Sequence, residues 1–227
     1  MSKLRPSFVL LALCLAAGLA ARAQGPVTPL DRVLSRISLG VSAPVEYTRT
    51  TSGSYSPYTI NSQQVSTASG YLINGRYIVR RYVGFEGNYK YSRTTQNFTY
   101  TEPAAPPQPL GTYQTNTLGV EANITEATFG YVAQLPKLPY ARPYASVGAG
   151  STRFKPTPVG GQGVHIQWRA TYYWSLGADA RIYHSPVDFR VQIRQLFYLA
   201  PDFGESYLTS HAHTSTFEPS VGFNFHF

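Results

Sequence analysis

The last eleven residues of this chain alternate between apolar and polar side chains without a break. The apolar set holds the odd positions, and polar or small residues fill the even ones: Phe217, Pro219, Val221, Phe223, Phe225 and Phe227 against Glu218, Ser220, Gly222, Asn224 and His226. Successive side chains of a β-strand point to opposite faces, so this pattern predicts a strand with one apolar and one polar face. A helix would repeat its apolar residues every three or four positions, and no segment shows that spacing over a useful length.

The same two-residue period recurs along the chain and predicts eight strands in all. The clear segments are 37–48, 83–92, 169–182, 189–198 and 217–227, and the weaker ones are 65–77, 127–133 and 145–149. The fourth strand, at 127–133, is the least certain. Just before it, Leu118, Val120, Ala122 and Ile124 hold the opposite parity, which predicts either a bulge or a loop that runs to about residue 122.

The gaps between these strands alternate in length. The long gaps are 51–64, 95–117, 155–167 and 199–212, and the short ones are 78–81, 135–141 and 183–187. Long loops at one end and tight turns at the other are typical of outer-membrane β-barrels. An even number of strands also places both chain ends at the end with the short turns.

Charged residues decide which face of each strand meets water. Only 13 % of the residues are charged, against roughly a quarter in an average protein, and pairs such as Glu86 with Lys90 lie on narrow polar strand faces among Gly, Ser and Thr. The interior of an eight-stranded barrel is just wide enough to be filled by side chains, and ions buried there have to be paired. We predict that nine residues form such a network: Glu46, Glu86, Lys90, Glu126, Asp179, Arg181, Arg190, Arg194 and Glu218.

The predicted fold is therefore all-β, an eight-stranded antiparallel up-and-down transmembrane β-barrel with a polar interior and a lipid-facing exterior. Tyr and Trp residues near both ends of the strands fit the two aromatic belts of such a barrel. The alternative is a soluble lipocalin-like barrel of the periplasm, whose apolar faces would point inward.

Residues 1–23 have the three parts of a secretory signal peptide. Lys3 and Arg5 make the start positive, an apolar stretch follows, and small residues precede the expected cleavage between Ala23 and Gln24. The expected division of the chain is signal peptide 1–23, a periplasmic segment 24–35 and the barrel 36–227.

The carboxy-terminal segment VGFNFHF resembles the signal by which outer-membrane barrels engage their assembly machinery, with Val221, Phe223, Phe225 and Phe227 as its apolar positions. The mature chain is similar to small eight-stranded barrels of the OmpA transmembrane-domain and OmpX type. It resembles more closely the uncharacterised outer-membrane β-barrel proteins of soil bacteria, through YLINGRYIVRRYVGFEGNYKYSRTTQ (71–96), RPYASVGAGSTRF (142–154) and RQLFYLAPDF (194–203). This resemblance implies a monomer exported to the outer membrane, in contact with its lipid and with the barrel assembly machinery. It carries no catalytic residues.

His213 and Ser215 are the one candidate catalytic pair. His-x-Ser resembles the pair of outer-membrane lipid A deacylases, whose serine and histidine face the bilayer. Thr216-Phe217 stands where that family has Asn-Ala, and no acid is placed to orient the histidine as a triad requires. We therefore expect no enzyme activity, and a lipid-modifying enzyme remains the alternative.

No other chemistry emerges from the chain. The only cysteine, Cys14, lies in the signal peptide, and the histidines lack metal-ligand spacing with a carboxylate, so we expect no metal and no cofactor. Nucleic acid is not an expected partner, because the cations form no basic stripe. We expect a structural or surface-interacting barrel with a plugged lumen and an extracellular ligand at its long loops. A narrow gated pore is a further alternative.

Overall fold

The structure, a computed structural model, describes residues 29–104, 106, 109, 111–136, 138, 140–182 and 185–227. The predicted signal peptide and its cleavage between Ala23 and Gln24 lie outside these residues. The elements in chain order are α2 (Pro29–Leu34), β1 (Ile37–Thr48), β2 (Thr51–Tyr55), β3 (Tyr58–Val65), β4 (Ala68–Arg80), β5 (Val83–Pro103), β6 (Tyr113–Gln134), β7 (Ala141–Pro156), β8 (Gln167–Arg181), β9 (Val187–Leu199), the 3₁₀ turn η1 (Ser206–Leu208) and β10 (His213–His226). No helix in the described ranges is long and apolar enough to cross a membrane.

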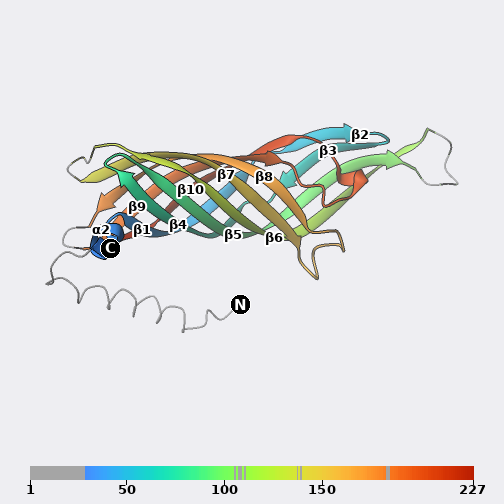
Figure 1. The fold of residues 1–227 in the computed structure, drawn as a ribbon. Helices are drawn as coiled ribbons and strands as arrows, with labels where there is room; N and C mark the ends of the chain where they lie inside the picture. The colour runs from blue at the N-terminus through green and yellow to red at the C-terminus, as the bar shows by residue number, and fades with distance from the viewer. Residues whose placement is uncertain are drawn as a thin grey trace.

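Eight of these strands form a closed antiparallel ring, which confirms the predicted fold class. The order around the ring is β1, β4, β5, β6, β7, β8, β9 and β10, and β10 pairs with β1 to close it. The carboxy terminus and α2 lie at the same end of the barrel (Figure 1). We call this the short-turn end, because β4–β5, β6–β7 and β8–β9 are joined there, and we call the opposite end the long-loop end.

Strands extend further at the long-loop end than the alternation predicts. Residues 51–64, predicted as a loop, form most of a hairpin of β2 and β3. β5 continues to Pro103 and β6 begins at Tyr113, inside the second predicted loop. β3 pairs with the upper part of β5, so β2, β3, β5 and β6 continue beyond the ring as an open four-stranded sheet (Figure 1). The extension is rich in Thr and Tyr, which favour strands, but its outer face does not have to be apolar, so the period-two pattern is lost.

The fourth strand of the ring, β6, contains no bulge. Its register with β5 is continuous from Tyr113 to Ala133, so the expectation of a bulge or a loop to about residue 122 is wrong. Val120, Ala122 and Ile124 point into the barrel and are buried. The apparent change of parity arises because the interior becomes apolar at this level, while the strand itself stays in register.

The outer face of the ring is apolar and the inner face is charged. Phe129 is 61 % exposed, and Val191 and Phe223 are about half exposed on the outer face. Arg190 and Glu218, by contrast, are fully buried inside. A soluble barrel would show the reverse arrangement, so the lipocalin-like alternative is wrong and the construction is that of a membrane barrel.

Candidate functional site

The lower cluster of the lumen consists of Arg76, Glu86, Asp179 and Arg190, all buried, on β4, β5, β8 and β9. Arg76 joins the two acids, with its Nε 3.0 Å from Glu86 Oε2 and its Nη1 3.4 Å from Asp179 Oδ2. Arg190 donates twice to Asp179, at 2.6 and 3.0 Å. The ring of Tyr144 lies under both guanidinium groups, 4.0 Å from Arg76 and 5.2 Å from Arg190. Two cations and two carboxylates therefore neutralise each other in a bidentate, hydrogen-bonded arrangement.

The upper cluster lies nearer the long-loop end and consists of Glu46, Lys90, Glu126, Arg194 and Glu218. The ammonium group of Lys90 contacts Glu218 and lies 3.4 Å from Glu46 Oε1 and 3.3 Å from Glu126 Oε2. Arg194 bridges two of the same acids, with Nη1 3.1 Å from Glu218 Oε2 and Nη2 2.5 Å from Glu126 Oε1. Three carboxylates thus share two cations.

Neutral side chains connect the two clusters. Asn88 donates to Glu86 Oε1 at 3.3 Å and to the hydroxyl of Tyr173 at 3.0 Å. Arg194 lies over the Tyr173 ring at 5.1 Å, and Ser146 donates to Glu86 at 3.1 Å. The charged groups therefore belong to one network that crosses the lumen from wall to wall.

The structure places eight of the nine predicted interior residues in these clusters: Glu46, Glu86, Lys90, Glu126, Asp179, Arg190, Arg194 and Glu218. The prediction for Arg181 is wrong. It is the last residue of β8, where the barrel wall ends, and its side chain is exposed. Arg76 was not among the predicted residues. Its even position in β4 indicates an inward side chain, because Tyr71, Ile73 and Tyr77 hold the odd, outward positions.

Toward the long-loop end, apolar side chains pack against one another inside the barrel. This apolar seal consists of Phe98, Val120, Ala122, Ile124, Phe154, Tyr173, Leu196, Tyr198, Phe203 and Leu208. Phe203 and Leu208 come from the connection between β9 and β10, which folds back into the barrel, and both are fully buried. The Phe203 ring packs edge-on against Phe98 and Phe154, with ring centroids 6.3 and 6.5 Å apart.

Asp202 fixes this connection to β8 through a set of contacts that we call the Asp202 latch. Its carboxylate accepts hydrogen bonds from Gln167 Nε2, from the Gly204 N–H at 3.1 Å and from Thr209 Oγ1 at 3.3 Å. Arg169 Nη2 lies 3.1 Å from the same carboxylate. Gln167 Oε1 in turn accepts the N–H groups of Asp202 and Phe203, at 2.9 and 3.1 Å. The latch therefore holds the backbone that carries Phe203 into the seal.

Protonation of Asp202 should loosen the latch. Partial burial alone would raise the pKa of Asp202, but the hydrogen bonds from Gln167 and Gly204 and the charge of Arg169 outweigh it, so the pKa lies below its ordinary value. A depressed carboxyl pKa stabilises the folded state above the pKa of the unfolded state, about 4 for Asp. This stabilisation is lost as the pH falls through the lower folded-state value.

The Asp202→Asn variant is expected to open the β9–β10 connection more readily, by about 1 kcal/mol at neutral pH, because the group is only half buried. The measurement is amide hydrogen exchange over residues 200–212. Wild-type protein should approach the exchange of the variant when the pH is lowered below the pKa of Asp202. Glu205→Gln, in the same connection but outside the latch, is the control. Unchanged exchange in Asp202→Asn would contradict the role of the latch.

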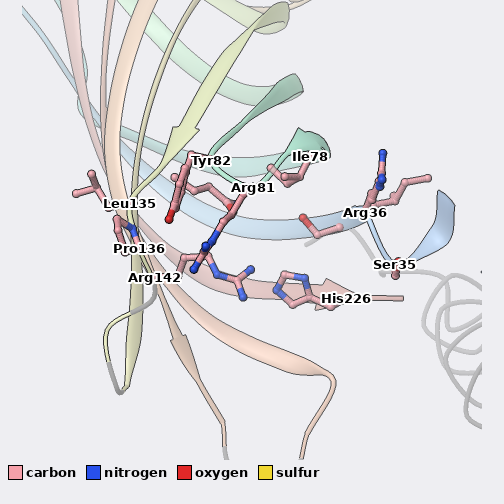
Figure 2. Close-up of a pocket in the computed structure, with 12 residues that line it drawn as sticks. Ser35, Arg36, Ile78, Arg81, Tyr82, Leu135, Pro136, Arg142 and His226 are labelled. Carbon is pink, nitrogen blue, oxygen red and sulfur yellow. The ribbon is translucent and has the colours of Figure 1, made fainter. Parts of the chain in front are cut away.

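The short-turn end holds an open cavity of about 300 Å³. Its lining includes Arg36, Arg81, Arg142 and His226, and Figure 2 shows Arg81, Arg142 and His226 close together at the opening. A smaller cavity of about 240 Å³ adjoins it and shares Ser35, Arg142 and His226. We call the two cavities together the short-turn mouth.

His213 and Ser215 lie on the outer face at the start of β10. His213 is exposed and Ser215 half-buried, and no hydrogen bond or ion pair joins His213 to a carboxylate within the described ranges. The described part of the chain also contains no group of three or more His, Cys, Asp or Glu residues able to hold a metal ion. The residues predicted to form the assembly signal, Val221, Phe223, Phe225 and Phe227, are all exposed.

Comparison with known proteins shows similarity in fold only. No protein-family model and no curated protein matches the sequence. Neisserial surface protein A superposes with a TM-score of 0.50 at 11 % identity, over 85 % of this chain and 98 % of that one. The outer membrane protein OprG from Pseudomonas aeruginosa gives the same TM-score at 11 % identity, over 84 % of this chain and 95 % of that one. The chain therefore has the fold of an outer-membrane β-barrel.

Proposed function

We propose that the chain is a non-enzymatic outer-membrane β-barrel with a structural or surface-interacting role. The observation that carries this proposal is the inverted burial, with ion pairs inside the ring and large apolar side chains exposed on the outer face. Only a hydrocarbon solvent makes that arrangement favourable, because each exposed apolar side chain would oppose folding in water. The resemblance to small barrels of the OmpA and OmpX type and to those of soil bacteria agrees with this role. In this proposal, residues 1–23 direct export and the apolar positions of β10 engage the assembly machinery.

The lumen is closed in this proposal. The charged network fills the middle of the ring, and the apolar seal covers it at the long-loop end. An eight-stranded barrel has an interior just wide enough for such side chains. The barrel therefore acts through its surface, and conduction through its centre is not part of its role.

The sheet extension is the surface best suited to meet a partner. β5 has 21 residues and spans about 70 Å at ~3.4 Å per residue, whereas about 9–11 residues cross a bilayer. Tyr55 and Tyr113 are exposed on the extension, and Tyr207 packs against Tyr58 and Tyr100 near its outer end. Rigid, exposed tyrosines are effective contact residues. We propose an extracellular ligand for this surface.

A charge on the outer face tests the membrane assignment. Phe129→Arg is expected to destabilise the barrel by about 2–4 kcal/mol in phosphatidylcholine vesicles, because arginine on the lipid face near the midplane is that unfavourable. The measurement is urea unfolding. Tyr140→Arg, at an exposed position of the β6–β7 connection, is the matched control and should change stability by less than about 1 kcal/mol. A neutral Phe129→Arg, or a wild-type chain that is freely soluble and lacks heat-modifiable gel mobility, would contradict the proposal.

A further inference from the structure

The short-turn mouth carries an excess of positive charge. Arg36, Arg81 and Arg142 line the larger cavity, whose lining includes no acid, and Arg181 lines the smaller one. The smaller cavity has two carboxylates, and both already have partners. Asp179 binds Arg76 and Arg190 in the lower cluster, and Asp188 lies 2.8 Å from His226 Nε2.

Arg81, Arg142 and Arg181 make no ion pair with any carboxylate in the part of the chain that the structure describes. Such arginines are ordinary on a convex surface, where water and salt screen them. In this mouth they face a common concave space, where like charges repel more strongly and attract anions.

Three groups converge on the mouth from three separate elements: the β4–β5 turn, β7 and β10. Figure 2 shows the Arg81 and Arg142 side chains turned toward the opening with the His226 imidazole beside them, while Arg36 points away. Arg81 lies in the turn between β4 and β5, and Arg142 is the second residue of β7, opposite Asp179 in the ladder. His226 is the last residue of β10. Arg142 and His226 are half-buried, so much of their mobility is already lost before a ligand arrives.

We propose that the short-turn mouth is an anion site for a phosphate group, bound by Arg81 and Arg142 with His226 at its side. A guanidinium donates two parallel N–H groups to an oxyanion. The terminal oxygens of a phosphate group, three in a monoester and two in the diester of a phospholipid, are arranged tetrahedrally around phosphorus, so two arginines on different elements can donate to the same group. A carboxylate has two oxygens in one plane and pairs with one guanidinium group. The cavity volume is at the lower limit of small-ligand pockets, which suits a phosphate with a small substituent.

The phosphate can belong to a free small molecule or to a phospholipid headgroup of the adjoining leaflet. The binding chemistry is the same in both cases. The compartment, the periplasm, rests on the proposed membrane orientation, whereas binding itself does not.

The test uses the mature chain, refolded in zwitterionic detergent micelles and titrated with inorganic pyrophosphate by calorimetry. Wild-type protein is expected to bind one equivalent. Arg81→Gln and Arg142→Gln should each weaken binding by about tenfold, the effect of losing a charge-assisted hydrogen-bonded pair. Arg80→Gln is the matched control, because it removes the same charge from the residue next to Arg81. Arg80 is exposed and does not line the mouth. Heat-modifiable mobility shows that each variant is folded, and Arg81→Gln alone suffices if Arg142→Gln does not fold.

Nanodiscs identify the source of the phosphate. A free ligand gives equal pyrophosphate affinity in phosphatidylcholine discs with and without phosphatidylglycerol. A headgroup ligand gives weaker apparent affinity when phosphatidylglycerol is present, and Arg142→Gln removes that difference. Either result supports the site. Absence of saturable binding, or equal losses in Arg80→Gln and Arg81→Gln, would overturn it and leave the proposed barrel function standing.

Discussion

Arg194→Met is expected to lower the free energy of unfolding by about 3–5 kcal/mol, the usual effect of removing one partner from a buried ion pair. Arg194 is 1 % exposed and bridges Glu126 and Glu218. Without it, three buried carboxylates have Lys90 as their only cation in the upper cluster. Methionine keeps most of the volume, so the loss reports charge rather than a cavity. Urea unfolding in vesicles at neutral pH measures the effect.

The matched control is Arg93→Met on the outer surface. The Nε of Arg93 lies 2.6 Å from Glu121 Oε1, but both groups are solvent-accessible, so the expected loss of stability is far smaller than for Arg194→Met. Adding Glu126→Gln to Arg194→Met should restore part of the stability, because it removes one of the carboxylates left without a partner. Equal effects of Arg194→Met and Arg93→Met would contradict the role of the network.

Phe203→Ala is expected to destabilise the long-loop end by about 3 kcal/mol, the cost of a large-to-small change in a closed apolar core. Phe203 is fully buried between Phe98 and Phe154, and the Asp202 latch prevents the connection from collapsing into the space left behind. Urea unfolding and amide exchange of residues 200–212 measure the loss. Ile166→Ala, at an exposed site on the neighbouring connection, should be nearly neutral.

The same variant tests whether the lumen conducts. Planar-bilayer recordings of wild-type protein and of Phe203→Ala are both expected to show no reproducible single-channel steps. The charged network remains paired below the seal, and no continuous water path opens when one ring is removed. Steps in the wild-type recordings would favour the gated pore, and steps in the variant alone would show that the seal is the barrier.

The ring could be predicted because lipid and the lumen act on alternate residues of every strand. Val191 and Phe223 lie at odd positions and point outward, where the wall meets lipid. Odd and even positions in these strands therefore correspond directly to the outer and inner faces of the wall. This correspondence between sequence position and polarity is lost in the sheet extension. Thr95 and Thr101 belong to β5, but the outer face on which they lie does not have to be apolar. The alternation of apolar and polar residues therefore does not reveal this part of the strand. It also fails at Val120, where the interior itself turns apolar.

The interior site was only partly accessible to sequence reasoning. Lys90 and Arg194 follow from position, because a charged residue of inward parity in an eight-stranded ring has to be buried. Arg181 shows the limit of that rule. It occupies an inward-facing position of the alternation, but it is the last residue of its strand, so its side chain reaches solvent. Phe203 could not be predicted, because its burial depends on a connection that folds back and is held by Gln167, 36 residues away.

The open sheet of β2, β3, β5 and β6 makes the rim of this barrel asymmetric, because the strands extend further on one side of the ring than on the other. β6 pairs with β7 only from Ala122 onward, so residues 113–120 extend beyond the end of β7. The β9–β10 connection packs along the extension, where His211 contacts Tyr55 and Tyr207 contacts Tyr58. In the proposed orientation, a large molecule that approaches this end from outside the cell meets the sheet extension on one side of the rim and the end of β7, which has no such extension, on the other. The two sides of the rim therefore offer different surfaces to a ligand.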